Sequence, residues 1–388
     1  MREALRLAQR GYGCTSPNPM VGAVLVKGAK IVGRGWHRAA GASHAEVEAL
    51  RDAASRGINA RGASLYVTLE PCCTHGRTPP CTEAIIAAGV RNVIVAATDP
   101  NPRHAGRGYD VLRSAGINLT DGVLADESTR LNEAFNHWIV RRTPLITVKA
   151  AMSLDGKIAT RTGESKWITG PVSRKRAMKL RQGADAILVG VNTVLKDNPS
   201  LTVRLPRISK KLRRIVLDSQ ARTPLSSRVV SDEDGQFTTV VVTKAASAQR
   251  VTALERKVQV WRAPACDGRV DIGWLLDKLG DQEMTSLLVE GGGEVNASFL
   301  LGGFAQRVAF FYAPVLIGGA QAIKATAGDG ILDATKGLRL TNVEWERLGR
   351  DLLLTARVEG RSNDAGLCLR ASSKKQRPSR PSAKAANP

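Results

Sequence analysis

Short apolar runs alternate with amphipathic helical patterns along most of this 388-residue chain, and the alternation restarts once, at Pro144. Strands that are separated by helices form sheets with helices packed on their faces, so the alternation predicts an α/β protein. Pro144 stands between a helical pattern and a new apolar run, and a proline disfavours helix in the residue before it. We therefore predict two domains, residues 1–143 and residues 144–360.

Local signals define the expected elements of the first domain. The stretches "VGAVLVKG" and "KIVGRGWH" predict two strands joined by a tight turn at Gly28 and Ala29. The next helix is expected to take Ser43 as its N-cap and to stop at Gly57. Further on, "ASLYVTLE" predicts a strand and "CTEAIIAAG" a helix that opens at Cys81. The stretch "DESTRLNEAFNHWIVRR" is expected to form one amphipathic helix.

The second domain holds more strands than the first. Helical patterns separate its early strands, whereas its last strands are expected to pair antiparallel. After Gly360 the periodicity stops, and residues 361–388 are rich in Ser, Pro and Lys and lack aromatic residues. We expect these last residues to form a disordered basic tail, because they cannot bury enough apolar surface to order.

The formal net charge of +22 is compatible with a nucleic-acid partner. Much of the excess is local, however: the last 17 residues carry five Lys or Arg and no acidic residue. A second basic cluster lies in "RLPRISKKLRR". A phosphorylated small molecule would also suit the remaining positive charge, so charge alone leaves both classes of partner open.

Composition also bears on the compartment. The chain has no run of eighteen apolar residues, so we expect no membrane span. The first residues, "MREALRLAQRG", predict a short amphipathic helix and lack the apolar region of a secretory signal. Three of the six cysteines lie close together in the sequence. Such a cluster favours metal binding or catalysis over disulfide bonds. We therefore expect a cytoplasmic protein.

The crowded cysteines predict a zinc site. Catalytic zinc takes three protein ligands and leaves its fourth position to water. In "HAE", His44 can approach a metal that lies off the open first turn of the predicted helix. Cys72 ends a strand at the same sheet edge, and Cys81 opens a helix, where the dipole favours a thiolate. We predict one zinc ion bound by these three residues, with Glu46 as the acid–base group beside it.

Two neighbouring candidates are assigned other places. Cys73 directly follows a predicted ligand, so its side chain should point away from the metal. His75 lies within the loop "THGRTPP" and is expected to face substrate or solvent. Each part of the predicted zinc site, taken singly, has a simpler explanation. An H-x-E on a helix is common at protein surfaces, and two cysteines nine residues apart can be core thiols.

Taken together, "HAE", then "PC" after a strand, then a helix-opening cysteine resemble the zinc-dependent nucleobase deaminase signature H-x-E…P-C-x-x-C. The loop between Cys72 and Cys81 is longer than in that signature, and "TSPNPMVGAVLV" lies upstream. Both features are similar to the pyrimidine deaminase branch of riboflavin biosynthesis. That resemblance implies Asn18 as a substrate-binding residue. It also implies that Glu46 moves protons while zinc lowers the pKa of its bound water to about 7.

In the second domain, "LVEGGGEVNASFL" places a glycine run between a strand and a helix. Such a turn suits a phosphate at the helix N-terminus, although many turns of this kind are only tight turns. The stretches "KAAMSLDGKIAT", "GESKWIT" and "AILVGVNTVLKDNPSLTVR" resemble the reductase half of the bifunctional deaminase/reductase family of riboflavin biosynthesis. The resemblance spans about residues 1–358. It implies a cytidine-deaminase-like three-layer α/β domain followed by a dihydrofolate-reductase-like α/β domain that uses NADPH.

The same resemblance implies the ligand contacts of the reductase. The positions implied for NADPH are Ala151, Trp167, Thr193, Asp197, Ser219, Gly292, Gly293, Glu294, Val295, Asn296, Ala297 and Ser298. The positions implied for the phosphorylated substrate are Lys149, Ser165, Arg181, Leu201, Arg204 and Glu290. Two arginines suit a phosphate because each offers a charged fork of donors. Lys149 is expected to steady the sugar oxygens, whereas Trp167 and Leu201 could also serve core packing.

The resemblance implies two consecutive steps of riboflavin synthesis on a phosphorylated pyrimidine. We expect a homo-oligomer with no membrane partner and no nucleic-acid partner, although the sequence does not fix the oligomeric state. One alternative is a tRNA-editing deaminase with an unrelated C-terminal domain. It would explain the charge, but an RNA editor has no use for NADPH motifs. A second alternative is a binding protein with structural zinc, which would have no need of Glu46.

Overall fold

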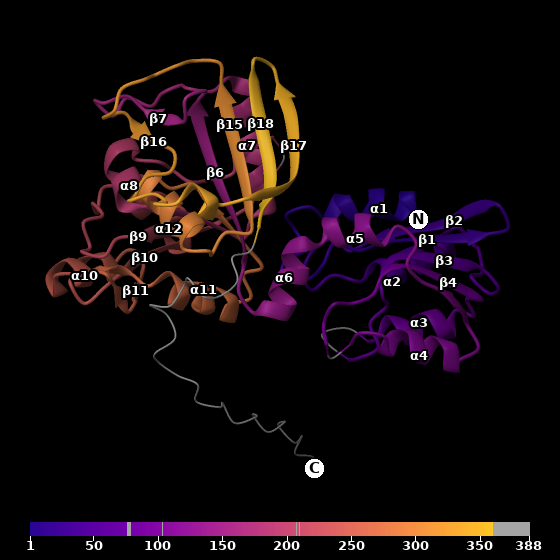
Figure 1. The fold of residues 1–388 in the computed structure, drawn as a ribbon. Coiled ribbons are helices and arrows are strands. Elements are labelled where there is room, and N and C mark those ends of the chain that lie inside the picture. The colour runs from indigo at the N-terminus through magenta and orange to yellow at the C-terminus, as the bar shows by residue number, and fades with distance from the viewer. Residues whose placement is uncertain (76–78, 103, 207, 209, 360–388) are drawn as a thin grey trace, which may run out of the picture.

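The computed structural model describes residues 1–75, 79–102, 104–206, 208 and 210–359. Two sheets organise these residues: a five-stranded sheet in the N-terminal part and a nine-stranded sheet in the C-terminal part (Figure 1). Strand β6 (Leu145–Ser153) starts the second sheet directly after Pro144. The predicted basic tail lies outside the described residues. Among the helices that are described, none has both the length and the hydropathy to cross a bilayer.

The first sheet has the strand order β2-β1-β3-β4-β5. Its strands are β1 (Gly22–Lys27), β2 (Lys30–Trp36), β3 (Ser64–Leu69), β4 (Asn92–Ala97) and β5 (Asn118–Thr120). The first two pair antiparallel around Gly28 and Ala29, which confirms the predicted hairpin. The strands β3, β4 and β5 run parallel, so their carboxyl ends meet at one edge of the sheet.

Helices cover both faces of this sheet, which gives the expected three layers (Figure 1). One face carries α1 (Arg2–Ala8) and α5 (Ala125–Leu131). The other carries α2 (Ala45–Ser55), α3 (Cys81–Ala87) and α4 (Arg107–Ser114). The main core lies under this second group of helices.

Two local predictions are wrong, and tertiary contacts explain both. His44, not Ser43, occupies the N-cap of α2, and its ring faces two cysteine thiols. The helix expected over residues 126–142 is divided into α5 and α6 (Glu133–Arg141) at Asn132. The Asn132 side chain accepts from the Met20 N–H at 2.7 Å and donates to the Met20 carbonyl at 2.9 Å. This pairing with another segment takes precedence over helical periodicity.

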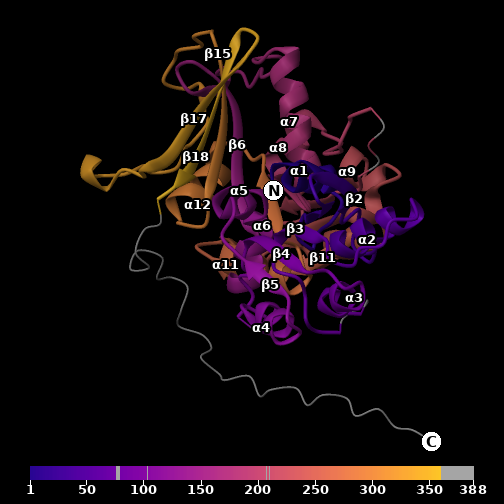
Figure 2. The same cartoon turned by 90° about the vertical axis from the view of Figure 1, so that its right-hand side faces the viewer.

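The second sheet has the order β11-β10-β9-β8-β14-β6-β15-β18-β17. Its strands besides β6 are β8 (Ala186–Gly190), β9 (Arg213–Leu217), β10 (Thr238–Val242), β11 (Gln259–Arg262), β14 (Ser286–Val289), β15 (Arg307–Ala313), β17 (Leu340–Leu348) and β18 (Asp351–Val358). The strands from β11 to β15 in that order are parallel, and β18 pairs antiparallel with both β15 and β17. The predicted antiparallel pairing of the last strands is confirmed. Figure 2 shows β17 and β18 as a long hairpin at the edge of the sheet.

Helices also cover both faces of the second sheet. One face packs against α11 (Ile272–Asp281) and α12 (Gly293–Leu301). The other packs against α7 (Pro171–Gly183), α8 (Val191–Asp197), α9 (Arg228–Ser231) and α10 (Ala248–Glu255). Burial on both faces explains why the central strands read as continuous apolar runs: all five residues of β8 are buried. Two small sheets, β7 (Lys157–Ala159) with β16 (Ile323–Lys324) and β12 (Ala265–Cys266) with β13 (Arg269–Val270), complete this part.

Candidate active sites

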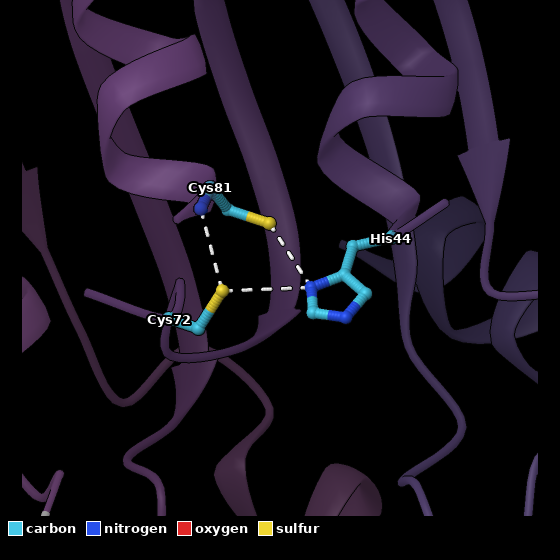
Figure 3. Close-up of side chains that lie close together, drawn as sticks. All are labelled: His44, Cys72 and Cys81. Atoms are coloured by element: carbon cyan, nitrogen blue, oxygen red, sulfur yellow. Dashed lines mark hydrogen bonds between the residues drawn. The ribbon is translucent and has the colours of Figure 1, made fainter. Parts of the chain in front are cut away.

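The three predicted ligands, His44, Cys72 and Cys81, come together at the carboxyl end of β3 (Figure 3). The His44 Nδ1 atom lies 3.2 Å from the Cys81 Sγ and 3.5 Å from the Cys72 Sγ. All three ligand atoms lie within 4.8 Å of one another. A tetrahedral zinc ion with ligands at about 2.0–2.3 Å would hold them roughly 3.5–3.8 Å apart. One imidazole nitrogen and two thiols at this spacing therefore fit zinc.

Close packing between α2 and strand β2, and a hydrogen bond between Cys81 and Cys72, place these side chains. Gly35 in β2 lies directly under the first turn of α2: an added Cβ would come 2.1 Å from the Ala45 carbonyl oxygen. A glycine there lets α2 approach the sheet, which carries His44 to the sheet edge. On the other side, the Cys81 backbone N–H donates to the Cys72 Sγ at 3.3 Å. Hydrogen bonds from Cys81 and His44 lower the pKa of the Cys72 thiol, which favours the thiolate that a metal needs.

The neighbouring candidates lie elsewhere. Cys73 is outside the cluster that the described residues form. The His75 side chain is exposed, 3.9 Å from the Glu83 carboxylate. Part of the loop that follows it, residues 76–78, lies outside the described residues.

Glu46, in the first turn of α2, lines a cavity of about 380 Å³ together with His44 and Cys72. The residue is only 3% exposed. Burial, and secondarily the negative charge on Cys72, raises the pKa of Glu46 to about 7. A carboxyl group with that pKa can both accept and donate a proton near neutrality.

Asn18, for which substrate binding stays a prediction, lines this cavity and contacts His37, a lining residue that was not predicted from the sequence. The Asn18 Nδ2 atom lies 3.1 Å from the His37 Nε2, and the His37 Nδ1 lies 3.1 Å from the Ser43 carbonyl oxygen. An amide donor fixes Nε2 as the acceptor, so Nδ1 carries the proton. Burial lowers the pKa of His37, which favours this neutral form.

Further lining residues come from the segment after β4, in "DPNPRH": Asp99, Asn101 and His104. The buried Glu70 holds this segment, because its carboxylate accepts from the N–H groups of Asp99, Gly106 and Gly108 at 2.9–3.1 Å. The sequence did contain a signal for these residues. A turn at the carboxyl end of a parallel strand is where α/β proteins commonly bind ligands.

A larger cavity of about 1000 Å³ lies in the second part, at the carboxyl ends of β8 and β9 and beside α12. The predicted residues that line it are Ser165, Thr193, Asp197, Ser219, Gly292, Gly293, Glu294, Val295 and Ser298. Lys196 and Arg222 also line it and were missed. The cavity size, the cationic side chains and the N-terminus of α12 fit a phosphorylated dinucleotide such as NADPH.

Four residues predicted for NADPH lie outside the described lining of this cavity. Asn296 and Ala297 are buried within α12, and the Asn296 Nδ2 donates to the Ala325 carbonyl at 2.8 Å. Ala151 packs against the buried cluster beneath α7. The Trp167 side chain is exposed, and the Arg174 guanidinium lies 4.6 Å from its ring centroid. Their contacts with cofactor remain predictions.

The structure joins three of the residues predicted for substrate. Arg181 donates to both carboxylate oxygens of Glu290 at 2.9 and 3.0 Å, and the Lys149 Nζ lies 3.5 Å away from one of them. Burial opposes ionisation of Glu290, but the two positive charges outweigh it and lower its pKa to about 2. Leu201 is buried, with φ of 53°, whereas Arg204 is exposed. Their contacts with substrate remain predictions.

Comparison with known proteins relates both parts of the chain to protein families. A family model described as "Cytidine and deoxycytidylate deaminase zinc-binding region" matches residues 1–97, and one described as "RibD C-terminal domain" matches residues 144–354. The riboflavin biosynthesis protein RibD of Aquifex aeolicus is 46% identical over 355 residues, which cover 91% of this chain and 96% of that protein. The chain belongs to the RibD family.

Two further relatives support the RibD assignment. The RibD protein of Actinobacillus pleuropneumoniae is 44% identical over 91% of this chain and 93% of its own length. A solved structure from Thermotoga maritima, titled a diaminohydroxyphosphoribosylaminopyrimidine deaminase/5-amino-6-(5-phosphoribosylamino)uracil reductase, is 35% identical. It superposes with a TM-score of 0.79 over 92% of this chain and 97% of that one.

As a RibD protein, the chain is a bifunctional enzyme of riboflavin biosynthesis with a zinc-dependent deaminase and an NADPH-dependent reductase. The predicted fold class, a cytidine-deaminase-like domain followed by a dihydrofolate-reductase-like domain, is confirmed. The match over residues 144–354 contradicts the unrelated C-terminal domain that the tRNA-editing alternative required.

Proposed function

We propose that residues 1–143 deaminate 2,5-diamino-6-(5-phosphoribosylamino)pyrimidin-4(3H)-one, and that residues 144–360 reduce the deaminated product to 5-amino-6-(5-phosphoribitylamino)uracil. The observation that carries the proposal is the buried Glu46 beside a histidine and two cysteines at zinc-binding distances. The T. maritima structure, whose title names this deaminase and this reductase, supports the choice of substrate.

In the deaminase, His44, Cys72 and Cys81 would hold zinc, which supplies Lewis-acid activation of water when bound. Glu46 takes a proton from the attacking water and delivers protons to the ring nitrogen and to the departing ammonia. Its pKa of about 7 suits both directions of transfer. Asn18 holds the pyrimidine, because its amide faces the cavity next to the buried His37.

In the reductase, NADPH supplies the hydride when bound. Thr193, Asp197 and Ser219 would contact it along the cavity, and the turn before α12 would receive its phosphates on exposed N–H groups. We propose that the C1′–O4′ bond of the ribosyl ring breaks as the amine proton moves to O4′, which gives an imine. Hydride then adds to C1′ and a proton from solvent adds to the imine nitrogen, which gives the ribityl group.

The charged cluster of the reductase is proposed to bind the sugar phosphate. The exposed Arg204 offers a forked set of donors for the phosphate. Arg181 adds its positive charge while its fork pairs with Glu290, and Lys149 steadies the sugar oxygens. Glu290 keeps the two cationic side chains of the cluster, Lys149 and Arg181, in place by pairing with both. Leu201 and Ser165 would complete the wall around the sugar.

We further propose a cytoplasmic homo-oligomer whose partner is a small phosphorylated pyrimidine rather than nucleic acid. The five described cysteines are free thiols, as is usual in a reducing compartment. The edge strand β17 exposes Val343 and Trp345, and apolar edges of this kind commonly pair with a second copy.

The test follows both reactions in the purified full-length protein. Ammonia release from the diamino substrate reports deamination, and NADPH oxidation with the deaminated intermediate reports reduction. We expect both activities and one zinc per chain. A protein that binds zinc yet releases no ammonia from this substrate would contradict the proposed deamination.

A further inference from the structure

The loop that carries Asn18 contacts the reductase half along its length. The Tyr12 hydroxyl donates to the Lys179 carbonyl at 3.1 Å, and the Gln182 side chain donates to the Tyr12 carbonyl at 3.3 Å. A Cβ on Gly13 would lie 2.2 Å from the Gln182 carbonyl oxygen, so the two backbones are in close contact. The deaminase pocket is therefore bordered by a loop that the other domain supports.

A further contact of this loop is made with a charged acceptor, Asp185, which lies between α7 and β8. The Ser16 hydroxyl donates to the Asp185 Oδ2 at 2.7 Å. The same oxygen accepts from the Thr285 N–H at 2.9 Å, the Thr285 hydroxyl at 2.8 Å and the Ser286 N–H at 3.2 Å. The Asp185 side chain is 14% exposed. The reductase domain thus presents a fixed, largely buried carboxylate, and hydrogen bonds to ionised acceptors are among the strong ones.

A short series of contacts leads from Ser16 to the zinc ligands. Asn18 is two residues further along the chain and contacts His37 at 3.1 Å. His37 contacts the carbonyl of Ser43, the residue before His44, and its ring meets the His44 ring edge-on at a centroid distance of 5.4 Å. A displacement of Ser16 would therefore move the side chain that is proposed to hold the pyrimidine.

The reductase domain also supplies part of the pocket wall. Glu283, in the connection between α11 and β14, lines the deaminase cavity together with Trp138 of α6. The Trp138 indole N–H donates to the Gly280 carbonyl at 3.0 Å, which attaches that wall to α11 of the reductase.

We propose that Asp185 of the reductase domain is a positioning residue for the deaminase: through Ser16 it holds the loop that presents Asn18 to the pyrimidine. The inference rests on the proposed deamination and adds that the deaminase pocket is complete only when the reductase domain is docked. Loss of a hydrogen bond to a charged group corresponds to roughly a ten-fold change or more. The effect should fall mainly on the KM of deamination.

The test compares three single substitutions in the full-length enzyme. Ser16→Ala removes the hydroxyl that reaches Asp185, and we expect about a ten-fold higher KM for the diamino substrate with little change in kcat. Ser16→Thr keeps a hydroxyl and should restore the KM. Tyr12→Phe, the matched control, deletes another hydroxyl that bonds across the same interface and should leave deamination close to that of the unsubstituted enzyme. Zinc content and reduction of the deaminated intermediate should be unchanged in all three.

A double-mutant cycle assigns the effect to the pair. Ser16→Ala should cause a clearly smaller loss in an Asp185→Asn background than in the unsubstituted enzyme, because the bond it removes is already weakened there. Normal deamination by Ser16→Ala, or an equal loss in Tyr12→Phe, would overturn the positioning role. Equal losses of deamination and reduction in Ser16→Ala would also overturn it, as general damage. Failure of the unsubstituted enzyme to deaminate would instead count against the proposed function itself.

Discussion

Replacing Glu290 by Gln should destabilise the reductase domain, because it leaves two cationic side chains without their partner. Arg181 and Lys149 both pair with this carboxylate, whose side chain is only 10% exposed. The pKa falls from an ordinary 4.5 to about 2, which corresponds to about 3 kcal/mol of stability at neutral pH. Measured losses on breaking buried ion pairs, about 3–5 kcal/mol, are of the same size.

The assay is thermal unfolding of Glu290→Gln beside a surface control. A loss of about 3 kcal/mol in a domain of this size should lower the Tm by roughly 6–12 °C. Glu346→Gln, which removes an exposed ion pair with Arg176, should change the free energy of unfolding by less than about 1 kcal/mol. A Tm of Glu290→Gln within about 2 °C of the unsubstituted protein would refute the reasoning.

The sign of the pH dependence gives a second check on Glu290. A carboxylate whose pKa is lowered on folding stabilises the protein above its unfolded pKa, and that contribution is lost as pH falls through the folded pKa. The stability difference between the unsubstituted protein and Glu290→Gln should therefore be constant near neutral pH. It should shrink as the pH falls from 4.5 towards 2.

Four further substitutions test the assigned roles. Glu46→Gln should retain zinc and reduce the deaminated intermediate normally, but lose at least about two orders of magnitude in deamination; near-normal deamination would remove Glu46 from the mechanism. Cys81→Ala should lose zinc and Cys73→Ala should keep it, as measured by metal analysis. The reverse result would show the ligand assignment to be wrong. Arg204→Ala should raise the reductase KM for the phosphorylated intermediate far more than the KM for NADPH, whereas equal increases would indicate general damage.

Features set by local conformation were predictable from the sequence. The hairpin at Gly28 and Ala29 follows from turn chemistry, and Gly28 has a φ of 59°. Cys81 opens α3 as expected, and Cys72 follows β3 at the same sheet edge. A strand end and a helix start both direct side chains to a common edge, so a local pattern was sufficient to bring the three candidate ligands together.

Features set by contacts between distant segments were not predictable. Asn132 ends α5 because its side chain binds the backbone of Met20, 112 residues away. The turn after β4 could have been proposed as a ligand-binding turn, but the approach of Asp99 and Asn101 to the deaminase cavity depends on the buried Glu70, which fixes their segment. The strand β17 was missed because seven of its nine residues are exposed, so the sequence carries little apolar periodicity there. Its pairing with β18 is what defines it.

The contacts between the two domains also could not be predicted from the sequence. Ser16 lies in the stretch "TSPNPMVGAVLV" beside Asn18, but nothing in that stretch points to Asp185, which is 169 residues away. Only the docked domains bring the hydroxyl to the carboxylate. The sequence could therefore assign Asn18 to the substrate by resemblance, but it could not show what holds Asn18 in place.

Removal of zinc tests the central claim, two independent chemistries on one chain, most directly. The enzyme is stripped with a chelator, and NADPH oxidation is followed with either the diamino substrate or the deaminated intermediate. We expect the stripped enzyme to oxidise NADPH only with the deaminated intermediate, and added zinc to restore oxidation with the diamino substrate. Zinc-free enzyme that still releases ammonia, or that fails to reduce the deaminated intermediate while remaining folded, would contradict it.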